Sequence, residues 1–589
     1  MRAILLLVVL VFPADATSQG LGAGGRPVGP DYSRSPVYGK NGIAATAQPL
    51  ASQVALDILQ KGGSAVDAAI AANAALGLME PTGNGVGGDL FAIIWDPETQ
   101  KLHGYNGSGR APVGRDLQDL KGSIEKLKQE QGVPADYEGI PSHGSLSVTV
   151  PGTVDGWFAL HERFGSLPMS EVLAPAIDYA REGFPVSPVI AYYFERNLAR
   201  FKQVAPMIEE LDNTMETYFK GNKAPLAGEL FRNSDLANTL ALLAQEGRNA
   251  FYSGRIAQTI DAYMKRIGGD LRLADFVAHR GEWVTPIGVN YKGYTLYELP
   301  PNGQGLAALM MLSILKNVDL SQWERGSPEV MHYMVEAKRL AFADMAASFA
   351  DPDFIKTPVQ TLISDEYGRQ QLQRINPNRA ADDYGPSEVL LEGEGDTTYL
   401  TVADASGMMV SLIQSNYRGM GSGLVPDGLG FMLQDRGELF ALTEGHPNVY
   451  APGKRPFQTI IPAFLMQGDK PVMSFGLMGG GMQPQGHVQV LINWLDFGMD
   501  IQAAGDAARF LHDGGASPTD LPYEGYGVLY VEPGVPQSTV GRLREMGHKV
   551  EYNGAGAMFG GYQAIYRNPQ TGVYSGATEM RKDGTVTAY

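Results

Sequence analysis

The spacing of apolar residues along the chain predicts two helices near its start. Residues 50–61 carry apolar side chains at helical spacing, and this run stops at Gly62-Gly63. Ser64 is placed to cap a second apolar helix that continues to about Leu78. The uninterrupted apolar run at 90–95 is then expected to form a strand.

The middle third of the chain is expected to be mostly helical. Ser327 and Pro328 suit an N-cap and the first helical position. The apolar residues that follow at helical spacing are Val330, Met334, Ala337, Leu340 and Ala341.

The pattern changes to a period of two after an acidic, glycine-containing segment at 391–396. Thr397–Ala403 is expected to form a strand, 404–407 a turn and 408–415 the returning strand. The last third is expected to contain short strands, a glycine-rich turn at 479–481 and two helices over roughly 487–510. Two sets of strands with helices on either side predict an α+β fold, a four-layer αββα sandwich.

Composition narrows the class of protein. Hydrophobic residues make up 44% and charged residues 19% of the 589 positions, so a sizeable core is expected. The 64 acidic residues outnumber the 46 basic ones and give a net charge of −18, which disfavours a nucleic-acid partner. Because the chain has no cysteine, disulfides, thiolate catalysis and cysteine-based metal sites are excluded.

The first residues have the order of a secretory signal. A positive charge at Arg2 precedes an apolar run at 3–12, and small residues follow at 14–16. We therefore expect a signal peptide at 1–16, a loose leader to about Tyr38, and a protein exported to the periplasm or the extracellular space. No later apolar run approaches the length that spans a bilayer, so no integral membrane segment is expected after signal removal.

Several common active-site patterns are absent or stand in the wrong context. Residues 83–88 have Gly-x-Gly-x-x-Gly spacing, but they follow a predicted helix and precede a strand, the reverse of a dinucleotide-binding fingerprint. The 9 histidines are scattered and give no local support to a triad or a metal centre, so neither a metal nor a cofactor is expected. What remains is Thr397, the first residue of a strand, which on local pattern alone is an ordinary strand threonine.

The surrounding motifs give Thr397 another meaning. From about Gly42 to the C-terminus the chain resembles the γ-glutamyltransferase family of N-terminal-nucleophile hydrolases. The motifs that carry the resemblance are 396–404, Ser415-Asn416-Tyr417, 83–89, 150–156, 299–305, Lys454-Arg455-Pro456 and Gly479-Gly480.

The resemblance implies a precursor that cleaves itself between Asp396 and Thr397. The products would be a large subunit, 17–396, and a small subunit, 397–589. A threonine hydroxyl is a poor nucleophile without a neighbouring base. Once Thr397 is N-terminal, its own α-amino group can serve as that base, because its reference pKa is about 7.7–8.0.

Other roles follow from the same resemblance. Ser415 falls where the family has a hydroxyl that holds the nucleophile's oxygen, although a serine at a strand end needs no such role. Gly479 and Gly480 fall on the glycines of the family's oxyanion hole, although glycine also serves a tight turn.

The residues that would bind the acyl group depart from the glutathione-type pattern. Ser108 stands where an arginine would hold the donor's α-carboxylate, and Arg110 is two residues away. The acid for the donor's amino group aligns with Leu439, with Glu438 adjacent, and a neutral partner aligns with Arg436. The remaining substrate-binding candidates are Asn416, Tyr417, Gln458 and Thr459.

Three functions stay open at this point. The first is hydrolysis or transfer of γ-glutamyl groups from amides such as glutathione, through a Thr397 acyl-enzyme. The second is an amidohydrolase for another acyl group, like the cephalosporin-acylase-like and oxamate-amidohydrolase-like branches of the family. The third is an inactive exported binding protein on the same scaffold. A gained guanidinium suits a donor with a distal carboxylate and no obligatory amine.

Overall fold

The computed structural model describes residues 34–384, 395–515, 517–519, 526–554 and 556–589. The expected signal peptide at 1–16 lies outside the described residues. So does most of the expected leader. The end of that leader is different from our expectation, since Val37–Gly39 forms strand β1 and pairs with β18.

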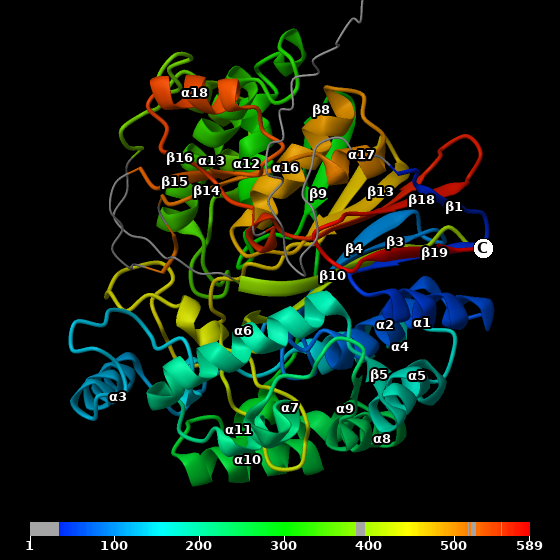
Figure 1. Cartoon of the computed structure of the whole chain (residues 1–589), viewed down its shortest axis with the longest axis vertical. Helices are drawn as coiled ribbons and strands as arrows, with labels where there is room; N and C mark the ends of the chain where they lie inside the picture. Colours follow the sequence, from blue (N-terminus) through cyan, green and yellow to red (C-terminus); the bar gives the residue numbers. More distant parts are fainter. Residues whose placement is uncertain (1–33, 385–394, 516, 520–525, 555) are drawn as a thin grey trace, which may run out of the picture.

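Two seven-stranded sheets lie face to face at the centre of the molecule (Figure 1). The first has the order β1 (Val37–Gly39), β18 (Tyr574–Thr578), β17 (Tyr562–Arg567), β13 (Lys470–Leu477), β12 (Ala463–Gln467), β9 (Tyr294–Glu298), β8 (Ile287–Tyr291). The second has the order β19 (Thr585–Ala588), β2 (Gly42–Thr46), β10 (Gly395–Asp404), β11 (Met409–Arg418), β3 (Asp89–Asp96), β4 (Lys101–Asn106), β7 (Glu282–Val284). Neighbouring strands within both sheets run antiparallel.

Helices cover the outer face of each sheet (Figure 1). Against the second sheet lie α1 (Pro49–Gln60), α2 (Ala65–Met79), α4 (Thr153–Phe164), α5 (Met169–Glu182) and α6 (Pro188–Val204), with α3 (Leu117–Gln129) and α7 to α11 (Asp212–Tyr218, Ser234–Glu246, Arg248–Tyr252, Arg255–Ile267, Leu273–Ala278) further out. Against the first lie α12 (Gly305–Leu315), α16 (Met482–Leu495) and α17 (Ile501–Asp506), with α13 (Pro328–Ser348), α14 (Val359–Leu362), α15 (Asp365–Leu372) and α18 (Gln537–Glu545) further out. The α+β sandwich with αββα layers is therefore confirmed.

The alternation of side chains along β10 explains why the layers stack. Leu400 and Val402 belong to the core that the strand shares with α1 and α2. Tyr399 and Ala403 point the other way and belong to the core between the two sheets. Successive strand residues face opposite sides, so one strand contributes to two cores.

Most expected elements agree with the structure. Ser64 caps α2 in a capping box with Asp67, and β10 and β11 form the predicted hairpin. The two helices expected at 487–510 begin earlier and end earlier, since strand β14 (Phe510–Asp513) already starts at Phe510. This strand joins β15 (Val528–Val531) and β16 (Val550–Tyr552) in a small separate sheet. Short strands were expected in this third of the chain, but without bounds and not as a separate sheet. The pair β5 (Phe184–Pro185) and β6 (Leu230–Phe231) was not predicted.

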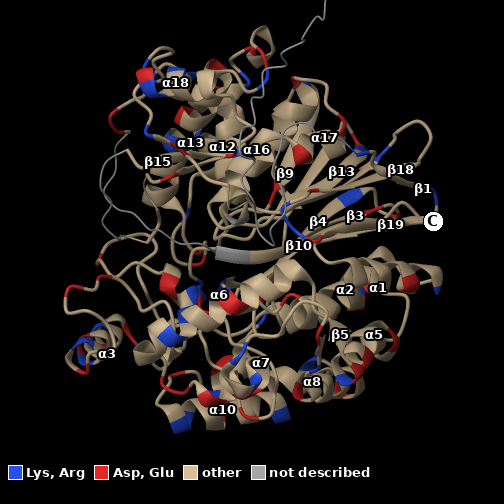
Figure 2. Ribbon diagram, in the orientation of Figure 1, with Lys and Arg blue, Asp and Glu red and all other residues tan. Residues whose placement is uncertain are grey.

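Charged residues gather on the outer helices and loops, whereas the strands of the two sheets are largely uncharged (Figure 2). Among the described residues, no helix combines the length and the apolar character needed to cross a membrane.

Candidate active site

Thr397 lies near the start of β10, where the pairing with β11 is irregular. Asp396 pairs with Tyr417 and Thr398 with Gln414, so β11 has one more residue than β10 between these pairs. Such a bulge redirects side chains locally. The Thr397 hydroxyl donates to Ser415 Oγ at 3.3 Å, and Ser415 Oγ accepts the Tyr417 N–H at 2.8 Å. Thr397 and Ser415 are both fully buried.

The glycine-rich loop between α2 and β3 packs directly against Thr397. A Cβ at Gly83 would lie 3.3 Å from three backbone atoms of Thr397, and a Cβ at Gly88 would clash with Ser415 and Asn416. This loop is therefore a close-packing element beside the hairpin. From the same region, Glu80 accepts the Thr398 hydroxyl at 2.8 Å and Asn84 donates to it at 3.1 Å. These bonds hold the first residues of β10 in place.

A second glycine-rich turn precedes α16. Gly479 has φ +116° and Gly480 φ +54°, which favour glycine at both positions. Gln304 donates to the carbonyl oxygens of Gly480 at 2.8 Å and Thr459 at 2.6 Å. Gly479, Tyr417 and Thr459 line one cavity of about 470 Å³. The turn, the end of β11 at Tyr417 and the loop at Thr459 therefore meet at the same cavity.

Arg110 and Ser108, both candidates for the acyl group, are committed to other partners. Arg110 contacts Asp351, Asp353 and Glu282 and donates to the Gly453 carbonyl at 3.1 Å. Ser108 is buried and its hydroxyl accepts from Asn302 and Gln458. Neither residue lines the cavity described above.

Arg436 lies in a different environment. Its guanidinium is fully buried, donates to the Thr459 hydroxyl at 2.8 Å, and lies 5.2 Å from the centre of the Tyr417 ring. Its Nε and Nη2 atoms have no acceptor among the described residues. Burial lowers the pKa of Arg436 to about 10, against the opposing charges of Asp89 and Asp435. The guanidinium thus stays protonated at neutral pH and retains unused donors.

The acidic residues around Arg436 were not all anticipated. Glu438 forms a two-bond ion pair with Arg418, at 2.6 and 2.5 Å. Asp435, which the sequence reasoning missed, accepts the Arg418 N–H through Oδ1, while its buried Oδ2 has no donor among the described residues. Burial raises the pKa of Asp435 to about 8, and the Glu438 charge adds to this effect.

Asn416 and Gln458 hold the surrounding framework. The Asn416 backbone donates to Gly83 and accepts from Asp435, tying the first glycine loop to the Arg436 segment. The Gln458 amide donates to Asp89 at 2.6 Å. Asp89 also accepts from the N–H groups of Gly109 and Gly152. The sequence contained a signal for this structural role, because Asp89 is an acidic residue that directly follows the glycine loop.

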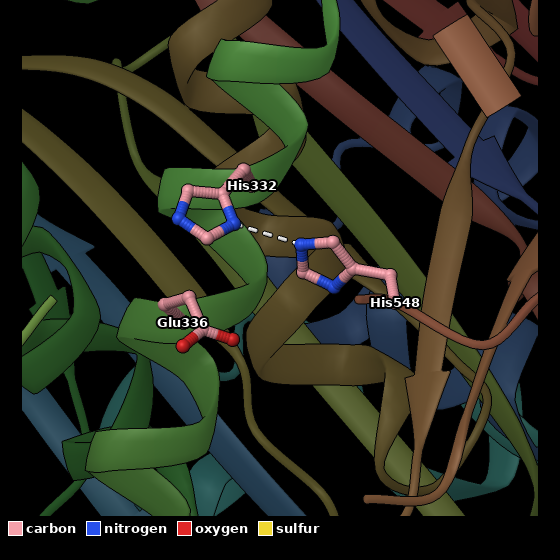
Figure 3. A group of neighbouring side chains, drawn as sticks. All are labelled: His332, Glu336 and His548. Carbon is pink, nitrogen blue, oxygen red and sulfur yellow. Dashed lines mark hydrogen bonds between the residues drawn. The ribbon is translucent and has the colours of Figure 1, made fainter. Parts of the chain in front are cut away.

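A second polar cluster, which does not line this cavity, joins His332 and Glu336 of α13 to His548, which lies between α18 and β16 (Figure 3). His332, Glu336 and His548 are buried and close enough to share an ion. However, His332 Nδ1 and His548 Nε2 are 2.7 Å apart and share a hydrogen bond, and Glu336 accepts from Arg339, Ala381 and Tyr384. These contacts describe a hydrogen-bonded network. The two histidines are 216 positions apart, so local spacing could not reveal it.

Known proteins resemble the chain over nearly its whole length. The family model for gamma-glutamyltranspeptidase matches residues 51–589. The chain is 36% identical to a glutathione hydrolase-like YwrD proenzyme of Bacillus subtilis, covering 93% of this chain and 99% of that protein. It is 34% identical to an oxamate amidohydrolase proenzyme of Klebsiella pneumoniae, covering 93% and 98%.

A solved structure shows the same fold. The crystal structure of a cephalosporin acylase from Bacillus halodurans superimposes with a TM-score of 0.85 at 40% identity, covering 95% of this chain and 97% of that one. These matches confirm the resemblance read from the motifs around Thr397. The chain belongs to the gamma-glutamyltranspeptidase family and is an enzyme of that family.

Proposed function

We propose that the chain is a precursor that cleaves itself between Asp396 and Thr397 and becomes an amide hydrolase with Thr397 as nucleophile. The large subunit would be 17–396 and the small subunit 397–589. The observation that carries this proposal is the position of Thr397. Its hydroxyl is hydrogen-bonded to Ser415 on the same hairpin, and Tyr417, two residues after Ser415, lines the cavity together with Gly479. Several of its relatives are proenzymes by name, which supports cleavage.

The reaction follows from these groups. The freed α-amino group accepts the Thr397 hydroxyl proton while Oγ1 attacks the amide carbonyl. The N–H groups of Gly479 and Gly480 stabilise the resulting oxyanion, and such a donor contributes about 3–4 kcal/mol to lowering the barrier. The C–N bond then breaks, the amine leaves with the transferred proton, and an ester remains on Thr397. Water attacks this ester, which releases the acid and restores the hydroxyl.

The acyl group is recognised by Arg436 and Asp435. Arg436 is anchored through Thr459 and offers Nε and Nη2 to a carboxylate. Asp435 offers Oδ2 to an ammonium group. Together they suit the amino-acid head of a γ-glutamyl group, which is the acyl group we favour.

A second acyl group has support of its own. Leu439 is apolar and lines the cavity at the position where the resemblance expects an acid. Because burial raises the pKa of Asp435 to about 8, its carboxyl is mostly neutral at pH 7 without a bound cation. A glutaryl-type acyl group, which has a distal carboxylate and no amine, fits these two observations.

Export is part of the same proposal. The order of charge, apolar run and small residues at 1–16 supports a signal peptide that is removed on secretion. N-terminal sequencing of protein recovered outside the cytoplasm tests it. A mature chain that still begins at Met1 would contradict it.

Intact mass spectrometry of the purified protein tests self-cleavage. Wild-type protein should give two chains, the smaller starting at Thr397. Thr397→Ala should remain one chain, and Thr397→Ser, which keeps a hydroxyl, should still be cut. A wild-type chain that stays whole, or a cut Thr397→Ala chain, would overturn the assignment.

A donor panel then identifies the acyl group. We would compare the p-nitroanilides of γ-glutamate, glutarate and pentanoate, which differ only in the distal groups. Turnover of the first above the second supports γ-glutamyl hydrolysis, and the reverse order supports the glutaryl alternative. Equal turnover of all three substrates would mean that Arg436 does not bind the distal carboxylate of the acyl group.

A further inference from the structure

The cavity beside Gly479 carries positive charge on the walls away from Arg436. Lys338 of α13 and Arg196 and Arg200 of α6 all line it. Asp513 is the one acidic lining residue among the described parts of the chain. The whole protein has a net charge of −18, so this local excess of cations runs against the overall composition. Cavities lined by one sign of charge concentrate ligands of the other sign.

Lys338 is held in a defined position within this cavity. Only 2% of its surface is exposed, and Nζ donates to the Gly514 carbonyl at 2.5 Å and to His512 Nδ1 at 3.2 Å. His512 can accept there because its Nε2 donates to the Tyr526 carbonyl at 2.9 Å, which fixes the tautomer. An ammonium has three N–H groups, and these two bonds use two of them. Within the described part of the chain the third N–H has no acceptor, so it can donate to a ligand.

One continuous wall connects Lys338 to the glycine turn. The Gln485 amide donates to the Gly481 carbonyl at 3.0 Å and accepts the His512 N–H at 3.0 Å. His512 in turn contacts Lys338. Apolar side chains of Phe342, Met345 and Phe457 line the same cavity. A substrate with its carbonyl at the glycine turn can therefore extend past an apolar section towards Lys338.

Arg436 does not itself line the cavity. It contacts Tyr417 and Thr459, which do, and the proposed function places the acyl tail beside these two residues. The Lys338 side is then left for the other half of the amide, the amine that departs when the C–N bond breaks.

We propose that Lys338 binds an anionic group, a carboxylate, carried by the amine half of the substrate, and that Arg196 and Arg200 attract the same group. The inference rests on the proposed amide hydrolysis, and it narrows the substrates to amides of amines that bear a carboxylate, as amino acids and peptides do.

Two substrates that share one acyl group test this directly. The 4-nitroanilide has a neutral leaving amine, and the 3-carboxy-4-nitroanilide has the same ring with a carboxylate. Both would carry the acyl group that the donor panel selects. Wild-type enzyme should show the higher kcat/KM on the carboxylated substrate. In Lys338→Met the ratio of the two kcat/KM values should fall about 10- to 100-fold, the range expected for a lost hydrogen bond to a charged group.

Matched variants separate binding from structure. Lys338→Arg, which keeps the charge, should restore part of the ratio. Lys265→Met removes a lysine that is exposed on α10 and should leave the ratio as in wild type. Both substrates are measured on the same preparation, so a partly misfolded sample does not change the ratio. Lys338→Gln serves if the methionine variant does not fold. A ratio unchanged in the uncharged variant would overturn the inference.

A direct binding measurement keeps the inference separate from the proposed function. If wild-type protein hydrolyses neither substrate, the proposed function fails. Calorimetric titration with the leaving amine, 5-amino-2-nitrobenzoate, then decides about Lys338. Binding at least about tenfold weaker in Lys338→Met supports the site, and equal binding in both proteins overturns it.

Discussion

Arg110 and Arg436 are two arginines that sequence reasoning placed near the acyl group, and their surroundings differ. Arg110 is about a quarter exposed and contacts three carboxylates and a carbonyl. Arg436 is completely buried. Within the described part of the chain it donates one hydrogen bond, to Thr459, and its Nε and Nη2 have no acceptor. A guanidinium whose two terminal nitrogens already donate to carboxylates and a carbonyl stabilises structure, whereas one with buried, unused donors can still bind a ligand.

The largest expected effect comes from removing the second of these arginines. In Arg436→Met, kcat/KM for donors with a distal carboxylate should fall about 100- to 1000-fold, because a buried charge-assisted pair contributes roughly 2–5 kcal/mol. Turnover of the pentanoyl anilide should change far less. The donor panel measures both values. Equal losses on charged and uncharged donors would show a structural role and remove the contrast with Arg110.

The same variant, Arg436→Met, should also raise the pKa of the buried Asp89 carboxyl. The Arg436 charge opposes the burial that raises the pKa of Asp89 to about 6. Without that charge the pKa should rise further. Since the ionised form of Asp89 is then less stable in the fold, Arg436→Met should lose stability as pH increases through this range. Thermal unfolding at pH 5 and pH 8 compares the two conditions.

A substitution at Asp435 distinguishes the γ-glutamyl from the glutaryl acyl group. Asp435→Asn keeps the size of the side chain and an oxygen for the Arg418 N–H. If Asp435 binds an ammonium, kcat/KM for the γ-glutamyl anilide should fall about 10- to 100-fold, while the glutaryl anilide should change by less than about threefold. A variant that hydrolyses both donors as wild type does would assign Asp435 to the framework alone.

Lys338 adds a third cation that titrates, unlike the two arginines. Burial and the Arg339 charge lower the pKa of Lys338 to about 7, although the Asp513 charge acts to raise it. Facing groups are the neutral His512 and the cavity-lining Asp513, Arg196 and Arg200. Lysine is charged below its pKa, so affinity for 5-amino-2-nitrobenzoate should weaken above pH 7, by up to about tenfold per pH unit. Calorimetry from pH 6 to pH 9 measures this, and Lys338→Arg should bind almost independently of pH.

The sequence predicted the framework well because the fold depends on local patterns. The period of two after 396 and the helical runs at 50–78 both correspond to observed elements. Short strands such as β14–β16 were expected in the last third only in general terms, because three to four residues contain too little periodicity to fix the bounds of a strand. β1 escaped because its pairing partner, β18, lies more than 500 positions away.

The partners of the site residues were harder to predict than their positions. The family resemblance pointed to Thr397, Ser415 and the glycine turn, and the structure brings Thr397 and Ser415 into hydrogen-bonding contact. Whether Arg110 or Arg436 has unused donors depends on which side chains surround each, and Asp351 is 241 positions from Arg110. Lys338 and His512 meet across 174 positions, so no motif joins them.

The smallest expected effect on activity completes the contrast between the arginines. In Arg110→Met, kcat/KM for every donor in the panel should stay within about threefold of wild type, because both terminal nitrogens of Arg110 already donate to protein acceptors. Stability should decrease by about 1–2 kcal/mol, since Asp351 is buried and loses one of its partners but keeps the Arg455 N–H at 2.8 Å. Urea unfolding measures that loss. If Arg110→Met instead lost activity selectively on substrates with a distal carboxylate, which is the result expected for Arg436→Met, unused N–H groups would be a poor guide to substrate binding. The ion-paired Arg110 guanidinium would then have to change partners when substrate binds.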